Sequence, residues 1–291
     1  DEAIESIYGY NENMLLSGMP ASGWFDYDNP INTLVPMSGY AINLGPDSGP
    51  ITVDITGEVN NGNMTLTVYN HDQLYTNGFN LVGNPFPSPV DWNLIEALSN
   101  NIDDAVYYFS NSDIDQYGGM YVTYINGVSS DGRATNIIPS MQGFFIHVTD
   151  GQWPVDGKLV MNNSVRVNDL DHPFIKSGKG EQPKLLRLSA FFSTSPQTKD
   201  YTVVYFDEQA TPEFDGQFDA LKLLNTDINV PSIFSITPVG TKLSINSMAN
   251  PGGKTLLVPL GIITQIDGNI RFSVSALDPS LNSMKISLID S

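Results

Sequence analysis

Cysteine is absent from the 291 residues, so the chain can form no disulfide and holds neither a thiolate metal site nor a thiol nucleophile. Histidine is scarce: His71, His147 and His172 lie far apart and belong to no HExxH or comparable motif. No GxSxG elbow and no glycine-rich phosphate loop occurs either. The sequence therefore predicts no catalytic residue, and we expect a protein that is not an enzyme.

Charged residues make up only 15% of the chain, and basic residues are scarcest in its first part. Residues 1–165 carry two basic residues, Arg133 and Lys158, against 19 acidic ones, a net charge of −17. Residues 166–291 carry 11 basic and 13 acidic residues, a net charge of −2. So acidic a surface repels phosphate backbones and anionic bilayers and attracts divalent cations. Nucleic acid and lipid are therefore not expected partners.

Long apolar runs are also missing. None approaches the roughly 18 residues of a membrane span, and the acidic start DEAIES has no feature of a signal peptide. We expect no direct membrane insertion, and an exported chain would have lost its signal or carried it upstream. Gly, Pro, Asn, Ser and Thr are abundant instead, which is typical of many short strands joined by turns. The composition predicts an all-β protein, and the length favours two domains.

Residues 78–92, GFNLVGNPFPSPVDW, carry the clearest local signals. Apolar alternation over residues 79–83 predicts a half-buried strand that ends at a Gly-Asn-Pro turn. Ser88 as N-cap, a following proline and Asp91 as capping-box acid predict one short helix over about residues 89–98.

Two short matches indicate an internal duplication in the first domain. Residues 15–27 match residues 80–92 at an offset of 65, and residues 37–42 match residues 141–146 at an offset of 104. The matches come in the same order, so the second copy is longer by about 39 residues. We expect residues 93–136 to contain the added part.

A polar stretch around Gly178-Lys179-Gly180 divides the chain. We predict two β-sandwich-like domains: an acidic β-rich domain over residues 1–167, a linker over 168–184, and an immunoglobulin-like or jelly-roll-like sandwich over 185–291. In the first domain, residues 51–55 and 64–69 should pair as a hairpin around an Asn-Gly turn. The second domain should contain strands at 185–192, 201–206, 220–224, 232–237, 242–245, 255–260, 269–275 and 285–289.

The motifs GNPFPSPVDW in residues 83–92, MQGFF in residues 141–145 and FDGQFDALKL in residues 214–223 resemble the non-catalytic C-terminal region of large secreted Bacteroidetes surface proteins. The resemblance covers roughly residues 15–291 and implies export by the type IX secretion route to the outer cell surface or beyond. The chain ends at residue 291 without the sorting domain of the full pattern. We therefore expect a fragment of a longer precursor.

Acidic residues on loops are candidate calcium ligands, because carboxylate oxygens suit a flexible six- to eight-coordinate site. Calcium is the one candidate cofactor, and ordinary Asx turns are the alternative. Two groups of acids are candidates: Asp113 and Asp115, and Asp207, Glu208, Asp215 and Asp219.

Aromatic residues in the enlarged second copy are candidates for glycan binding, because sugars dock on exposed rings. Alternation along residues 105–109 places Tyr107 and Tyr108 on opposite faces of a strand, so at least one of them should be a core residue. The candidate ligand-binding residues are Tyr107, Tyr117, Tyr121 and Arg133.

These observations favour a non-enzymatic, monomeric module of a secreted or cell-surface protein, with an adhesion, spacer or presentation role and an extracellular protein or a glycan as partner. The first alternative is a carbohydrate-binding module attached to an enzyme outside this fragment. A glycosidase, which needs two carboxylates across a cleft, is a weaker alternative.

Overall fold

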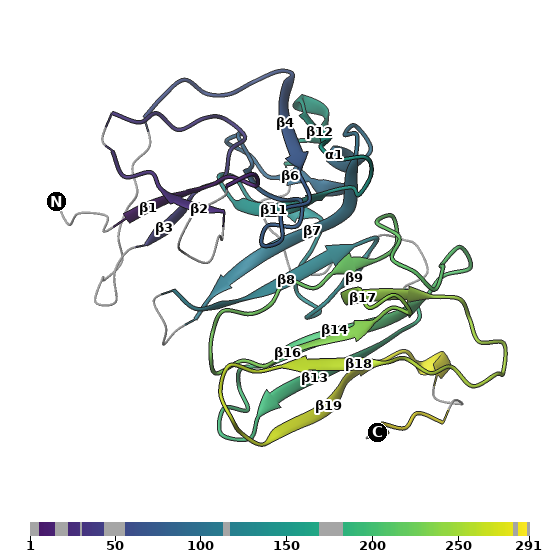
Figure 1. The fold of residues 1–291 in the computed structure, drawn as a ribbon. Helices are drawn as coiled ribbons and strands as arrows, with labels where there is room; N and C mark the ends of the chain where they lie inside the picture. Colours follow the sequence, from purple (N-terminus) through teal and green to yellow (C-terminus); the bar gives the residue numbers. More distant parts are fainter. Residues whose placement is uncertain are drawn as a thin grey trace.

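The computed structural model describes residues 6–14, 23–29, 31–43, 56–112, 117–168, 183–281 and 285–289. These residues form strands and one α-helix of five residues, so the all-β prediction is confirmed. Figure 1 shows a first unit, residues 6–168, above a second unit, residues 183–289. None of the described helices has the length and hydrophobicity needed to span a bilayer. Most of the predicted linker, residues 169–182, lies outside the described residues.

The first unit combines several small antiparallel sheets. Its strands are β1 (Ser6–Tyr10), β2 (Trp24–Asp26), β3 (Ala41–Asn43), β4 (Met64–Asn70), β5 (Phe79–Gly83), β6 (Val90–Asp91), β7 (Ile102–Asn111), β8 (Gly119–Ile125), β9 (Val128–Ser129), β10 (Ile137–Ile138), β11 (Gly143–Val148) and β12 (Val155–Met161). The largest sheet has the order β5-β11-β7-β8-β9, and β2-β1-β3 forms an N-terminal sheet. The pairs β12-β4 and β10-β6 and a 3₁₀ turn, η1 (Asn163–Val165), complete the unit.

Strand β5 lies where it was predicted but is buried on both faces. Val82 packs into a core cluster with Phe86 and Phe144 of the first unit. Phe79 and Leu81, on the opposite face, join a second cluster that continues into the second unit. The apolar alternation predicted the strand. It could not predict that the face with Phe79 and Leu81 is covered by the second unit, which is distant in the sequence.

Helix α1 (Trp92–Glu96) is shorter than predicted and begins later. Its N-cap is Asp91, whose Oδ1 accepts a hydrogen bond from the Asn93 backbone N–H at 3.0 Å. The expected first helical turn is strand instead, because β6 pairs with β10. Ser88, the predicted cap, accepts a hydrogen bond at Oγ from Arg166 Nε at 2.8 Å.

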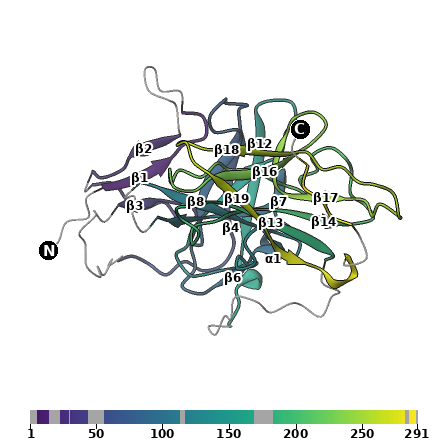
Figure 2. The same cartoon turned by 90° about the horizontal axis from the view of Figure 1, so that it is seen from below.

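The second unit is one curled sheet, shown from the side and from below in Figures 1 and 2. Its strands are β13 (Leu185–Phe192), β14 (Asp200–Phe206), β15 (Ala220–Leu221), β16 (Ser232–Ile236), β17 (Lys242–Met248), β18 (Leu260–Ile263) and β19 (Ile270–Leu277), followed by a 3₁₀ turn, η2 (Pro279–Leu281). The order is β18-β16-β17-β14-β13-β19, with β15 also on β17 and with β14 parallel to β17. Strands β14 and β16 pair with neighbouring parts of β17, residues 245–248 and 242–243, and so lie close together without pairing with each other.

Two predicted strands of the second unit are wrong. The strand expected at 255–260 begins only at Leu260, directly after Pro259, because proline has no N–H to donate to a ladder. Residues 285–289 form no strand and leave Ile286 and Leu288 exposed. For the predicted hairpin, residues 51–55 lie outside the described residues, and β4 pairs with β12 along its whole length.

One aromatic contact in the first copy has an equivalent in the second copy, at the positions that the two offsets predict. The rings of Tyr27 and Tyr40 lie 4.9 Å apart, and those of their counterparts Trp92 and Phe144 lie 5.9 Å apart. Strand partners differ, since β3 pairs with β1 whereas β11 pairs with β5 and β7. The counterpart of β5, residues 15–18, lies outside the described residues, so the superposition of the copies stays a prediction.

Candidate functional site at the junction of the two units

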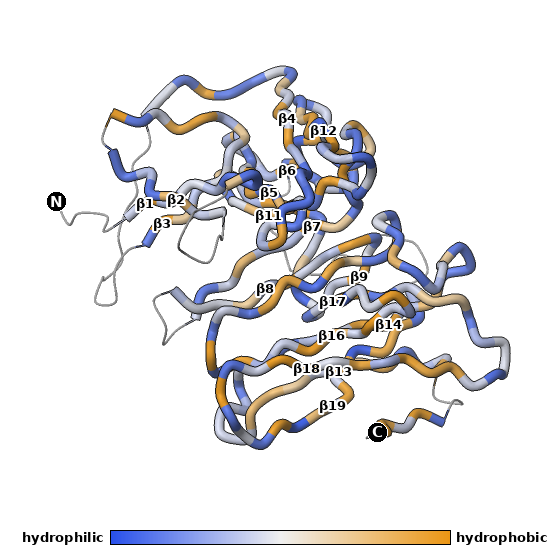
Figure 3. Tube along the Cα trace, viewed as in Figure 1, coloured by the Kyte–Doolittle hydropathy of each residue, from blue (hydrophilic) through white to orange (hydrophobic). Residues whose placement is uncertain are grey.

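The two units share a continuous apolar cluster, here called the junction core. It is formed by strands β5, β7, β8 and β11 and the β9 turn of the first unit and by β14, β15 and β17 of the second. Figure 3 shows hydrophobic stretches along β8 and β9, at the border with the second unit. The buried members are Phe79, Ala105, Tyr107, Ile125, Val128, Phe145, Val203, Tyr205, Ala220 and Ile245.

Hydrogen bonds fix the register of the two units around this core. The Tyr107 hydroxyl accepts a hydrogen bond from the Leu221 backbone N–H at 3.0 Å. Arg187 Nε and Nη2 donate to the carbonyl oxygens of Ser130 and Ser129, each at 2.9 Å. A guanidinium with two fixed carbonyl partners holds one orientation, so the junction is both apolar and directional.

An acidic pocket of about 490 Å³, here called the junction pocket, lies beside the core. Four of its carboxylates belong to the first unit and one belongs to a loop of the second. The two sides are joined by a hydrogen bond from the Asp104 backbone N–H to the Gly216 carbonyl oxygen, at 2.9 Å. The pocket is lined by Glu96, Asn101, Ile102, Asp103, Asp104, Thr149, Asp150, Thr211, Phe214, Asp215, Gly216 and Gln217.

Asp104 has the most perturbed carboxyl in this pocket. Burial, the largest cause, raises the pKa of Asp104 to about 7. The charge of Glu96 and its hydrogen bond with Asp104 raise this pKa further, as do the charges of Asp103 and Asp215. Near neutral pH this carboxyl therefore exchanges a proton with solvent. Carboxyl groups with raised pKa values occur in binding and catalytic pockets, and they also occur in clusters that have only a structural role.

Asp103, which lines the pocket, and His147 form a buried pair. His147 Nδ1 lies 2.5 Å from Asp103 Oδ2, and both side chains are almost wholly enclosed. The imidazole also contacts the rings of Phe79 and Phe214. A Cβ at Gly216 would collide with the Asp103 carboxylate, so the loop of the second unit can approach this pair only with glycine at that position.

The predicted ligand-binding residues do not form one platform. Tyr107 is 1% exposed and belongs to the junction core, so its assignment as a ligand contact is wrong. Its neighbour Tyr108 is half-buried against the core cluster of the first unit, and its hydroxyl donates to the Thr135 carbonyl oxygen. Tyr121 packs on the rim of the core against the Phe145 ring. Sequence reasoning placed the two tyrosines on opposite faces correctly but could not show that a second unit covers one face.

The other two candidates are at the surface and are separate from each other in the fold. Tyr117 is 67% exposed in the connection between β7 and β8. Arg133 follows β9, and its exposed guanidinium donates from Nε to Asp131 Oδ2 at 2.8 Å. These two remain candidates for contact with a glycan or protein.

The candidate calcium ligands of the second unit are engaged by the protein itself. Asp219 Oδ1 accepts from the Ser247 N–H and Oγ at 2.6 and 2.8 Å, and Oδ2 accepts from the Asp215 N–H at 2.9 Å. Asp207 and Asp215 accept from the backbone N–H two residues on, as in Asx turns, whereas Glu208 is exposed. Within the described ranges no three acidic or histidine side chains gather as a cation site, and Asp113 and Asp115 lie outside those ranges.

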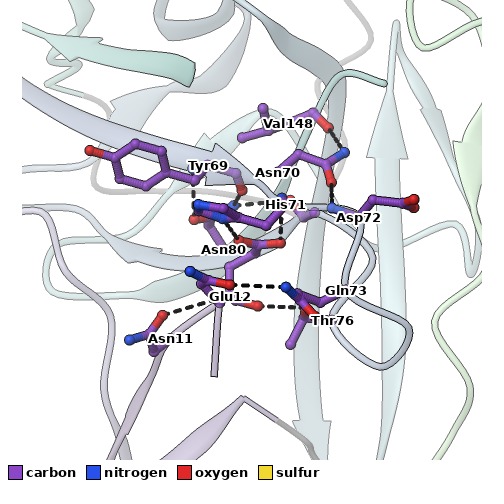
Figure 4. A network of polar contacts seen from close by, with 12 residues as sticks. Asn11, Glu12, Tyr69, Asn70, His71, Asp72, Gln73, Thr76, Asn80 and Val148 are labelled. Carbon is purple, nitrogen blue, oxygen red and sulfur yellow. Dashed lines mark hydrogen bonds and ion pairs between the residues drawn. The ribbon is translucent and has the colours of Figure 1, made fainter. Parts of the chain in front are cut away.

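A second polar network, shown in Figure 4, joins the residues directly after β1 to the rest of the first unit. The buried carboxylate of Glu12 accepts from the His71 backbone N–H at 2.9 Å and contacts His71 Nδ1 at 2.6 Å. Thr76 Oγ1 donates to the Glu12 carbonyl oxygen at 2.6 Å. These contacts join the residues that follow β1 to the chain between β4 and β5.

A family model described as Domain of unknown function (DUF8693) matches residues 1–291. The chain belongs to this family. Comparisons with curated proteins and with solved structures found no match.

Sequence reasoning did not combine Asp103, Asp104 and His147 into one site. The available signal was the Asp-Asp pair at the start of an apolar strand, where alternation turns one carboxylate inward. Their meeting with Asp215 depends on the docking of the second unit, for which the sequence carries no local signal.

Proposed function

We propose that this chain is a non-enzymatic module of a secreted or cell-surface protein, in which it acts as a rigid spacer that presents other parts of that protein. The observation that carries this proposal is the junction core, because it makes two β units into one body. Interfaces between mobile domains are typically small and polar. Here Tyr107, Ile245 and their neighbours would become exposed if the units separated.

The surface location is supported by the resemblance of the motifs in residues 83–92 and 141–145 to secreted Bacteroidetes proteins. The acidic first unit fits the same role, because a high net negative charge keeps a protein soluble and apart from anionic bilayers. Tyr117 and Arg133 are the residues that this proposal offers to an extracellular protein or glycan, since both are exposed on the first unit.

Small-angle X-ray scattering of the purified chain tests the spacer role. We expect one rigid arrangement to account for the whole profile. Arg187→Ala should broaden the distance distribution, because the guanidinium bonds to Ser129 and Ser130 across the junction. The matched control is Arg271→Ala, which removes an exposed guanidinium bonded to Ser193 within the second unit. A wild-type profile that requires many relative orientations of the units would contradict the proposal.

A sugar-binding or glycoside-hydrolysing pocket is the second candidate, and the observation that favours it is the perturbed carboxyl of Asp104 among other carboxylates in the junction pocket. A glycan array with and without calcium, followed by hydrolysis assays on any bound glycan, tests it. Hydrolysis by the wild type that disappears in Asp104→Asn, with the fold intact, would replace the spacer proposal by an enzymatic one.

A further inference from the structure

The second unit contains a lysine and an aspartate that are buried against each other. Lys222 follows β15, Asp200 begins β14, and Lys222 Nζ lies 2.5 Å from Asp200 Oδ2. The two side chains are 1% and 4% exposed. The pair is therefore held in contact and shielded from water, two conditions that favour a direct reaction between its members.

Burial makes the charged form of this pair costly. A lysine ammonium has three N–H donors, and within the described part of the chain Asp200 Oδ2 is its one acceptor. Two ions in a low-dielectric interior lose their hydrogen bonds to water, and here the protein replaces only some of those hydrogen bonds. Passing one proton from the ammonium to the carboxylate gives an amine and a carboxylic acid, the neutral reactants of amide formation.

A backbone donor holds the carboxyl group of Asp200 in place beside the lysine. The Ile233 N–H donates to Asp200 Oδ2 at 2.7 Å, on the same oxygen that faces the lysine. This hydrogen bond fixes the position of Oδ2, and with it the carboxyl carbon, beside the amine that would attack.

We propose that Lys222 and Asp200 condense into an intramolecular amide bond. The Nζ–Cγ bond forms and the Cγ–Oδ2 bond breaks, and Oδ1 becomes the amide oxygen. Oδ2 holds the proton that it received from the ammonium, takes a second proton from the amine and leaves as water, so no oxidant, reductant or cofactor takes part. Among the described residues no further acid or base bonds to either side chain, so the reaction uses the protons of the pair itself and should be slow.

The bond would brace the loop by which the second unit docks on the first. Residues 200–222 would become a closed covalent loop that contains two junction contacts, the carbonyl oxygens of Gly216 and Gln217, which accept from Asp104 N and Asn126 Nδ2. In a chain without cysteine, an amide is a covalent brace that reducing conditions do not open. This inference concerns the second unit alone and does not depend on the spacer role, so the scattering test and the test below can fail separately.

The test is the intact mass of the full chain under denaturing conditions, followed over days of incubation of the folded protein. We expect a growing fraction that is lighter by one water, and a branched peptide that joins Lys222 to Asp200 after proteolysis. Lys222→Arg should show the full mass of its sequence. Lys199→Arg, which changes a lysine whose Nζ lies over the Phe191 ring, should lose water as the wild type does.

A wild-type chain that keeps its full mass throughout overturns the proposal. So does a loss of water that persists in Lys222→Arg, because it would then come from elsewhere, such as a succinimide at Asp215-Gly216. If Lys222→Arg does not fold, the peptide map of the wild type decides alone, and absence of the branched peptide overturns the proposal.

Discussion

Asp104 is the residue whose chemistry depends most on the junction. Its pKa in the folded chain, about 7, lies above its ordinary value of 3.8 because of burial and the neighbouring carboxylates. The folded state therefore binds the proton more tightly than the unfolded state, and the free energy of unfolding falls as pH rises from about 4 to 7. Burial also raises the pKa of Asp219 to about 6, which acts in the same direction over a narrower range.

We predict that Asp104→Asn reduces this pH dependence. The amide cannot ionise, so the free energy of unfolding at pH 8 should rise by about 1 kcal/mol, a value discounted for the partial exposure of the carboxyl. Urea unfolding at pH 5, 6, 7 and 8 measures it. Asp156→Asn, on an exposed position of β12, is the control and should leave the wild-type slope in place. An unchanged slope in Asp104→Asn would show that the carboxyl is ionised throughout.

Tyr107→Phe tests the polar side of the junction core. The change removes the acceptor of the buried Leu221 N–H and leaves the apolar ring in place, so stability should fall by about 1–3 kcal/mol. Chemical denaturation measures the loss. Tyr75→Phe, at an exposed position, should change stability little. Equal, small effects of both changes would place the Tyr107 hydroxyl in contact with water.

At the scale of elements, local sequence patterns predicted where strands lie but not which strands pair or which faces are buried. The alternation in residues 79–83 located β5, and turn residues bounded it, because both signals are local. The start of α1 was misplaced because β6 pairs with β10, forty-odd residues further along the chain, and that pairing overrides the capping signal at Ser88. The junction core was not predictable for the same reason: Tyr107 and Phe145 are buried by strands of the other unit.

The observed cap gives a prediction for α1. Asp91→Ala removes the acceptor of the Asn93 N–H and of Asn136 Nδ2, so stability should fall by about 0.5–2 kcal/mol. Leu94→Ala, on the exposed side of the same helix, is the control and should cost less. Thermal unfolding followed by circular dichroism compares the two. A larger loss for Leu94→Ala would mean that the helix depends on packing at that position and not on the cap.

At the scale of the whole molecule, the net charge differs between the two parts of the chain, whereas the apolar contacts are shared by both units. The negative charge is concentrated in residues 1–165, whereas the apolar contacts run without a break from β5 and β7 into β14 and β17. A shared core couples the unfolding of two units, because opening either one exposes apolar surface of the other. We therefore predict that the two units unfold as one cooperative body, although the sequence pattern favours two domains.

Differential scanning calorimetry of the purified chain tests this claim most directly. We predict a single transition whose calorimetric and van't Hoff enthalpies agree, and Tyr107→Phe should move that transition as a whole to lower temperature. Two resolved transitions in the wild type, of which Tyr107→Phe shifts only one, would contradict it.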